Sequence, residues 1–176
     1  LFVQLPGFGD YNYLPSESQL ATFREAQAKS LTLPNTAMAV AIDLGEWNDI
    51  HPDRKKPVGD RLALAAEKIA YRENIVYAGP LYQSSKIEGD KIIISFTNTG
   101  TGLSTNDNEA PAEFAIAGED KKFVWANAKI DGDKIIVSSE EVPNPKYVRY
   151  AWADTPLNPN LINKEGLPAA PFRADE

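Results

Sequence analysis

The chain has 176 residues, of which 43% are hydrophobic and 24% are charged, a composition typical of a folded globular protein. Its net charge of -7 and its pI near 4.8 argue against nucleic acid and anionic membrane surfaces as partners, because both bind through clusters of Lys and Arg. No apolar run approaches the roughly 20 residues that a membrane-spanning helix needs. The absence of cysteine excludes disulfides, zinc-thiolate sites and thiol nucleophiles, and we expect neither a cofactor nor a metal ion.

The chain opens on a strand-like segment, residues 2–5, and then on a helix pattern. The opening lacks the basic start of a signal peptide, and we expect the chain to be a fragment of a longer polypeptide. Ser16 and Gln19 have the spacing of a capping box, which predicts the start of a helix. The predicted apolar flank of this helix consists of Leu20, Phe23, Gln27 and Leu31.

A second strand and a second helix follow, separated by a loop. Residues 37–44 are apolar almost without interruption, which predicts a parallel strand covered on both faces. Behind Pro57, a favourable residue in the first turn of a helix, apolar residues recur at helical spacing. They are Val58, Leu62, Ala65 and Ile69. Alternating strands and helices of this kind indicate a layered α/β fold.

From Ile75 onward the pattern changes to short strands separated by turn residues. Residues 86–95 (KIEGDKIIIS) return as residues 129–138 (KIDGDKIIVS), and each copy predicts a β-hairpin because its Gly supplies the positive φ of a tight turn. Asp131 and Asp133 could suggest a calcium site, but a calcium loop needs more oxygen ligands than these turns provide. Further strands are expected at residues 113–117, 122–128 and 147–153. We therefore expect an all-β, sandwich-like region, in which Trp125 and Trp152 belong to the core and the chain after Asp154 is the loosest part.

The candidate chemistry lies in the loop after residue 44, which contains the only histidine, His51. Imidazole titrates near neutral pH, so His51 is a candidate proton carrier if a neighbour orients it. Asp49 is the nearest candidate for that role, while Asn48 or a backbone carbonyl are alternatives; Asp43, Glu46 and Asp53 are the other carboxylates nearby. No serine lies in a recognisable nucleophile motif. His51 and Asp49 could equally be ordinary turn residues.

Several segments, taken together and in order, resemble the sialate O-acetylesterase family of the SGNH hydrolase superfamily. The central block, residues 42–52 and 58–66, is similar to the last conserved block of that family. The other segments that carry the resemblance are residues 23–27, 77–82, 116–125, 148–154 and 163–173.

The resemblance implies a fold class and a division of the chain. Residues 1–74 would be the C-terminal part of a three-layer, flavodoxin-like SGNH hydrolase sheet, and residues 75–176 a β-rich C-terminal domain.

The resemblance also implies an esterase that removes O-acetyl groups from sugars through a Ser-His relay, with His51 as the general base. The superfamily commonly has Asp three residues before the histidine, where this chain has Asn48, so the role of Asp49 stays open. Trp47 could line the sugar or acyl pocket, whereas the roles of Arg24 and Glu25 stay open. Family members often act in an extracellular, periplasmic or lysosome-like compartment.

The family's nucleophilic serine and oxyanion donors belong to blocks that this chain does not contain. We therefore expect an N-terminal companion segment of the same enzyme to supply them, and we expect little activity from this chain alone. The expected ligand is an O-acetylated sugar or glycan. The alternative is a non-catalytic carbohydrate-binding or interaction module built on the β-rich region.

Overall fold

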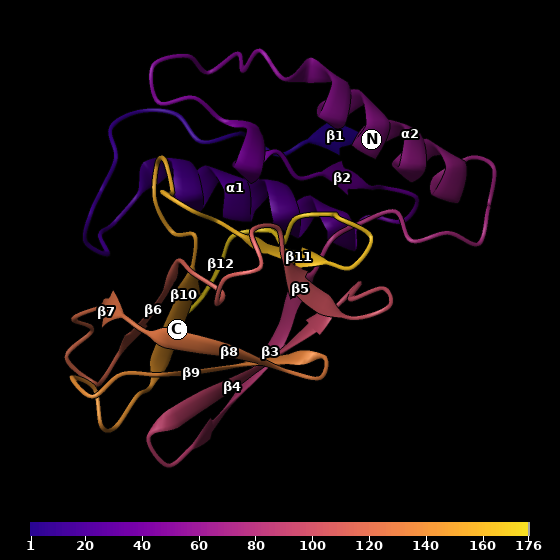
Figure 1. Ribbon diagram of the computed structural model, residues 1–176. Helices are drawn as coiled ribbons and strands as arrows, with labels where there is room; N and C mark the ends of the chain where they lie inside the picture. Colours follow the sequence, from indigo (N-terminus) through magenta and orange to yellow (C-terminus); the bar gives the residue numbers. More distant parts are fainter. Residues whose placement is uncertain (176) are drawn as a thin grey trace.

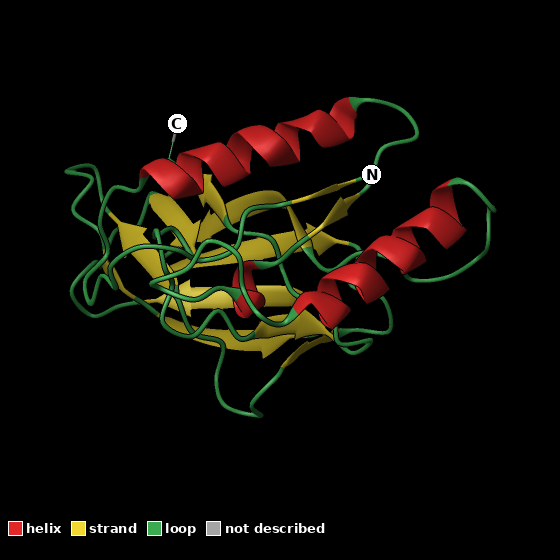
Figure 2. Cartoon of the chain, turned by 90° about the horizontal axis from the view of Figure 1, so that it is seen from above, coloured by secondary structure: helices red, strands yellow, loops and turns green. Residues whose placement is uncertain are grey.

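The computed structural model describes residues 1–175. Its amino-terminal part contains two short parallel strands, β1 (Phe2–Val3) and β2 (Met38–Ala39), and two α-helices, α1 (Gln19–Lys29) and α2 (Lys55–Ile69). In Figure 1, α2 lies on one side of the parallel strands and α1 on the other, between those strands and the antiparallel sheets. Seen from above, the two helices run in roughly the same direction (Figure 2). Within residues 1–175, no helix is long and apolar enough to cross a membrane.

The predicted strand over residues 37–44 is much shorter than expected. Only Met38–Ala39 pair with β1, and a 3-10 helix, η2 (Ile42–Leu44), follows. The whole run from 37 to 42 is nevertheless buried, so the apolar pattern correctly reported burial but not backbone conformation. Pairing ends early because β1 itself has only two residues, and the amide of Leu44 then bonds to the carbonyl of Ala41 in a turn.

The cap and the buried face of α1 also differ from the prediction. The N-cap is Ser18 rather than Ser16, and its hydroxyl accepts a hydrogen bond from the amide of Ala21. The buried residues of the helix are Ala21 and Arg24, whereas Phe23, predicted on the apolar flank, is 59% exposed. The buried side of α1 therefore includes a charged side chain, Arg24. A search for apolar residues at helical spacing does not identify such a side.

The remaining strands form antiparallel pairs. They are β3 (Leu81–Glu88), β4 (Lys91–Thr97), β5 (Leu103–Thr105), β6 (Phe114–Ala117), β7 (Val124–Trp125), β8 (Asn127–Asp131), β9 (Lys134–Ser138), β10 (Tyr147–Tyr150), β11 (Leu161–Asn163) and β12 (Phe172–Ala174). One four-stranded sheet has the order β3-β4-β9-β8, another the order β12-β10-β6-β7, and β11 pairs with β5. The fold is thus mixed, with helices and parallel strands first and several antiparallel sheets after them.

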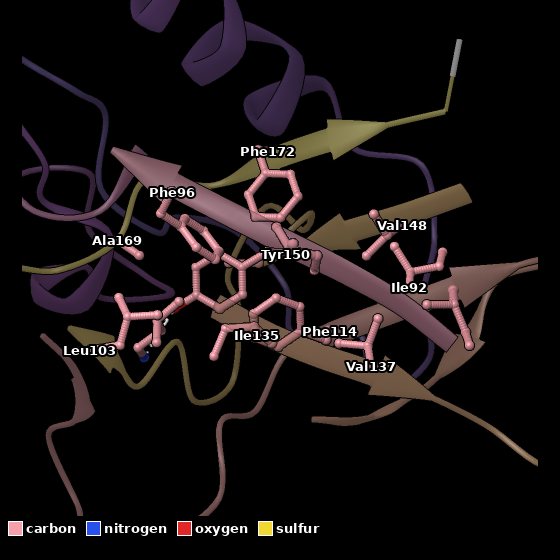
Figure 3. Close-up of a cluster of buried hydrophobic side chains, with 14 of the residues drawn as sticks. Ile92, Phe96, Leu103, Phe114, Ile135, Val137, Val148, Tyr150, Ala169 and Phe172 are labelled. Carbon is pink, nitrogen blue, oxygen red and sulfur yellow. Dashed lines mark hydrogen bonds between the residues drawn. The ribbon is translucent and has the colours of Figure 1, made fainter. Parts of the chain in front are cut away.

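One large hydrophobic cluster joins the two four-stranded sheets (Figure 3). Isoleucines of β4 and β9 from one sheet meet aromatic residues of the other, such as Phe114 and Tyr150, whose ring centroids lie 4.7 Å apart. Burial of this apolar area is the main source of stability for the β-rich region.

The repeated sequence forms two hairpins, as predicted. Their turns contain Gly89 with φ +61° and Gly132 with φ +60°, the left-handed conformation that favours glycine. The second strands of the two hairpins pair with each other, with Ile93 opposite Ile136. The two copies thus form the single sheet β3-β4-β9-β8.

The expectation that the chain after Asp154 is loose is wrong for residues 155–175. This segment contributes β11 and β12 to two sheets, and Leu161 and Phe172 belong to the main core. Residue 176 lies outside the described residues. The prediction for Trp152 is confirmed, since it is buried, but Trp125 is 37% exposed and its indole N–H donates to the carbonyl of Tyr13. The prediction for residues 155–175 failed because the Pro and Asn residues of this segment obscured any strand pattern, although its apolar residues reach the core.

The side chain of Arg24 connects three separate segments of the chain. Its guanidinium donates to the carbonyls of Leu5 and Pro6 at 2.9 and 2.6 Å, and to those of Ala153 and Asp154 at 2.7 and 2.8 Å. Arg24 is fully buried, and this burial lowers the pKa of the guanidinium to about 10, so it stays charged at neutral pH. A buried cation is tolerable here because main-chain carbonyls accept four hydrogen bonds from it.

We predict that Arg24→Lys lowers the free energy of unfolding by about 2 to 4 kcal/mol, because an ammonium group cannot reproduce the planar set of hydrogen bonds to four carbonyls. Urea unfolding monitored by circular dichroism measures this. The matched control is Arg54→Lys, at an exposed arginine that makes no capping bond, where a change within about 0.5 kcal/mol is expected. Equal effects of the two substitutions would contradict this role of Arg24.

A second prediction concerns Glu113, a residue next to β6 whose carboxylate accepts a hydrogen bond from the amide of Asn158. Burial raises the pKa of Glu113, so its contribution to stability is present at low pH and is lost as the pH rises through the folded-state pKa. We expect Glu113→Gln to become more stabilising relative to the parent chain between pH 4 and pH 7. Thermal unfolding at both pH values, with the exposed Glu140→Gln as control, tests this; a gain that shrinks toward pH 7 would contradict it.

Candidate active site

The loop that carries His51 leaves η2 at Gly45, where two backbone segments lie in close contact. A Cβ atom at position 45 would overlap the backbone of Gly7, so only glycine fits there without a shift. The loop is tied down again by the amide of Asp53, which donates to the Glu46 carboxylate at 2.9 Å. The histidine therefore lies on a short loop that is held at both ends.

The structure brings His51 and Asp49 together. One carboxylate oxygen of Asp49, Oδ1, accepts a hydrogen bond from the backbone amide of His51 at 2.7 Å and lies 3.4 Å from the imidazole Nδ1. The His51 side chain is 83% exposed. An acceptor beside Nδ1 favours the tautomer with its proton on that nitrogen and leaves Nε2 available to accept a proton.

The other carboxylates considered as partners have different contacts. Asp43 makes a two-point ion pair with Arg61, with both distances 2.7 Å, and Arg61 also donates to the carbonyl of Val40. Glu46 holds the amide of Asp53. Within residues 1–175, the imidazole has an ion-pair contact with Asp49 only, and its polar contacts include neither Asn48 nor a serine hydroxyl.

Trp47 lies on the same loop and has 52% of its surface exposed. Its carbonyl accepts a hydrogen bond from the amide of Gly9 at 2.8 Å, so its backbone is fixed while its side chain remains accessible. An exposed indole fixed in this way can offer an apolar face to a sugar ring. Among residues 1–175, no group of three or more His, Cys, Asp or Glu side chains could hold a metal ion.

Sequence reasoning missed residues 154–155, which hold the start of α1 and the segment at residues 8–9. Asp154 caps α1, since its Oδ1 accepts hydrogen bonds from the hydroxyl of Ser18 at 2.5 Å and from the amide of Leu20. Thr155 donates from its hydroxyl to the carbonyl of Gly9. The glycines at positions 7 and 9 were the available signal, because closely spaced glycines often mark close backbone approach.

Comparison with known proteins gives a consistent set of relatives. No family model matches the chain. The chain is 30% identical to the sialate O-acetylesterase of Rattus norvegicus over 157 residues, which is 81% of this chain and 28% of that protein. It is also 30% identical to the human sialate O-acetylesterase over 161 residues, or 81% of this chain and 29% of that protein.

A solved structure, that of a carbohydrate acetylesterase from Xanthomonas citri, matches with a TM-score of 0.91 and 45% sequence identity, covering 98% of this chain and 40% of that one. The chain thus spans less than a third of the length of the sialate O-acetylesterases that it matches. Over that shared length, the chain is similar to members of the sialate O-acetylesterase family.

Proposed function

We propose that this chain is the histidine-bearing portion of a carbohydrate O-acetylesterase, which hydrolyses acetyl esters on sugars through a Ser-His relay. The observation that carries the proposal is the likeness to the Xanthomonas citri carbohydrate acetylesterase, at 45% identity over 98% of this chain. The arrangement of His51 and Asp49 supports the chemical role, because an oriented, exposed imidazole on a fixed loop suits general-base catalysis.

In the proposed reaction, Nε2 of His51 takes the proton of a serine hydroxyl while the serine oxygen attacks the acetyl carbonyl. The imidazolium then gives this proton to the departing sugar oxygen as the ester bond breaks. In the second half, the imidazole takes a proton from water while the water oxygen attacks the acyl carbon. The imidazolium then returns this proton to the serine oxygen as the acyl-serine bond breaks and acetate leaves. Asp49, whose Oδ1 lies 3.4 Å from Nδ1, would favour the tautomer that this sequence of transfers requires.

The nucleophile would come from an N-terminal companion segment of the same enzyme. This companion would also provide the oxyanion donors, each worth roughly 10² to 10³ in rate, so the chain alone would be nearly inactive. In this proposal residues 1–74 complete a three-layer, flavodoxin-like sheet and residues 75–176 form a sandwich-like domain. We refer to the chain together with this companion as the assembled enzyme.

Part of the sheet edge in this chain is already covered. The side-chain amide of Gln27 donates to the carbonyl of Val3 and accepts from the amide of Leu5, and Arg24 bonds to the carbonyl of Leu5. Side chains of α1 thus take the place of a neighbouring strand at the carboxyl end of β1. In this proposal a companion strand would pair with β1 on the amino-terminal side of the Val3 carbonyl.

Trp47 would line the sugar or acyl pocket beside His51. Its exposed indole is suited to stack on a sugar ring, and its backbone is held by the hydrogen bond from the amide of Gly9. An extracellular, periplasmic or lysosome-like compartment, where acetylated glycans occur, fits this role.

We predict that His51→Ala in the assembled enzyme lowers kcat for an acetylated sugar by about 10² to 10⁴, the usual contribution of a general base. Acetate release measures the turnover, and circular dichroism confirms that the variant folds. Unchanged turnover would exclude His51 as the base. Saturable glycan binding by the chain, unchanged by this substitution and without hydrolysis, would favour the binding-module alternative.

The role of Asp49 is tested by a matched pair of substitutions in the same loop. Asp49→Asn should lower kcat by at least about tenfold, because an amide no longer favours the productive tautomer. Asp53→Asn removes a carboxylate of the loop that has no contact with the imidazole and should leave kcat within about twofold. Equal effects of both would show that Asp49 acts only through the charge or the fold of the loop.

A further inference from the structure

A continuous set of contacts joins the β-rich region to the loop that carries His51. It runs from residues 154–155, which follow β10, through residues 7–9 to residues 45–47. We infer that Thr155 is a positioning residue. Through Gly9 and Gly7 it holds the loop that carries His51 in the position that catalysis requires. This inference rests on the proposed function of His51.

The central contact is on Gly9, which is held from both sides. The Thr155 hydroxyl donates to the carbonyl of Gly9 at 2.7 Å, and the amide of Gly9 donates to the carbonyl of Trp47 at 2.8 Å. Gly9 has φ +97°, a conformation that L side chains rarely adopt. Because Gly9 adopts this conformation, it can bond to Thr155 of the β-rich region on one side and to Trp47 of the loop on the other. Trp47 lies four residues before His51 in the sequence.

A second contact acts in parallel. A Cβ placed on Gly7 would lie 3.4 Å from the methyl group of Thr155, and on the other side Gly7 lies in close contact with Gly45. The hydroxyl of Thr155 thus bonds to Gly9, and its methyl group lies close to the position that a side chain on Gly7 would take. The amide of Phe8, between them, donates to the carbonyl of Asp154 at 3.2 Å, and Tyr11 forms a parallel bridge with Thr155.

The histidine needs this support because its own side chain contributes little to holding the loop. The His51 side chain is 83% exposed, whereas Thr155 is 4% exposed and fixed by its surroundings. A displacement of a reacting group by about 1 Å can lower a rate by about 10². A buried threonine that fixes the segment beneath the loop would therefore influence turnover without touching the substrate.

The test uses Thr155→Val, which removes the hydroxyl and nearly keeps the shape, with Thr105→Val as matched control. Thr105 is also buried, and its hydroxyl donates to the carbonyl of Glu109 at 2.8 Å, in β5 rather than beside the histidine loop. Thr155→Ser, which keeps the hydroxyl, is the conservative rescue. Thr155→Ala is the second variant should the valine substitution fail to fold.

The first readout needs no activity. His51 is the only histidine, so its imidazole gives a single set of NMR signals in the whole chain. We expect Thr155→Val to shift these signals and to increase hydrogen exchange at the amide of Gly9 at least about tenfold, while Thr105→Val changes neither and Thr155→Ser restores both. Unchanged signals and exchange in Thr155→Val would overturn the inference.

The second readout is turnover by the assembled enzyme with an acetylated sugar. Thr155→Val is expected to lower kcat by roughly five- to twentyfold with little change in KM, and Thr155→Ser to recover most of it. If His51→Ala abolishes turnover while Thr155→Val behaves like Thr105→Val, the positioning role is wrong and the proposed function stands. If His51→Ala leaves turnover unchanged, the proposed function fails, and the positioning role for catalysis fails with it.

Discussion

The burial of one cation, the guanidinium of Arg24, is the constraint on which the rest of the structure depends. A buried positive charge is costly unless its donors find acceptors, and here carbonyls from two distant segments accept four hydrogen bonds from the guanidinium. Residues 5–6 and 153–154 must therefore lie against the same helix. This requirement attaches the parallel strands to the β-rich region, although the two are built from opposite halves of the chain.

The same segments continue directly into the candidate site. Asp154 uses its carbonyl to bind Arg24 and its carboxylate to cap α1, and the next residue, Thr155, contacts the glycine segment beneath the histidine loop. The β-rich region is thus more than an attached module, because the segment between β10 and β11 contacts residues 8–9, and Gly9 in turn bonds to Trp47 in the loop that carries His51. An esterase built in this way would couple the folding of both regions to the placement of its base.

The sequence predicted well those features that depend on interactions between residues close together in the chain. The two hairpins follow from their Gly-containing turns and β-branched strands, and α2 follows from apolar residues behind Pro57. The loop with His51 and Asp49 could be identified because both residues are neighbours in the sequence. Failures arose where partners are distant: Ser18 replaced Ser16 as the cap because Asp154 binds it, and Arg24 took the buried face that Phe23 was expected to occupy. The spacing of residues in a single sequence does not show that a side chain will bond to a carbonyl more than 100 residues away.

The most direct test of the account is a crystal structure of the assembled enzyme with a bound acetylated sugar or a tetrahedral mimic of the reaction. The account predicts a serine oxygen within hydrogen-bonding distance, about 2.6 to 3.2 Å, of Nε2 of His51, with Asp49 still beside Nδ1. A structure in which the nucleophilic oxygen reaches a different base, with His51 still facing solvent, would contradict it.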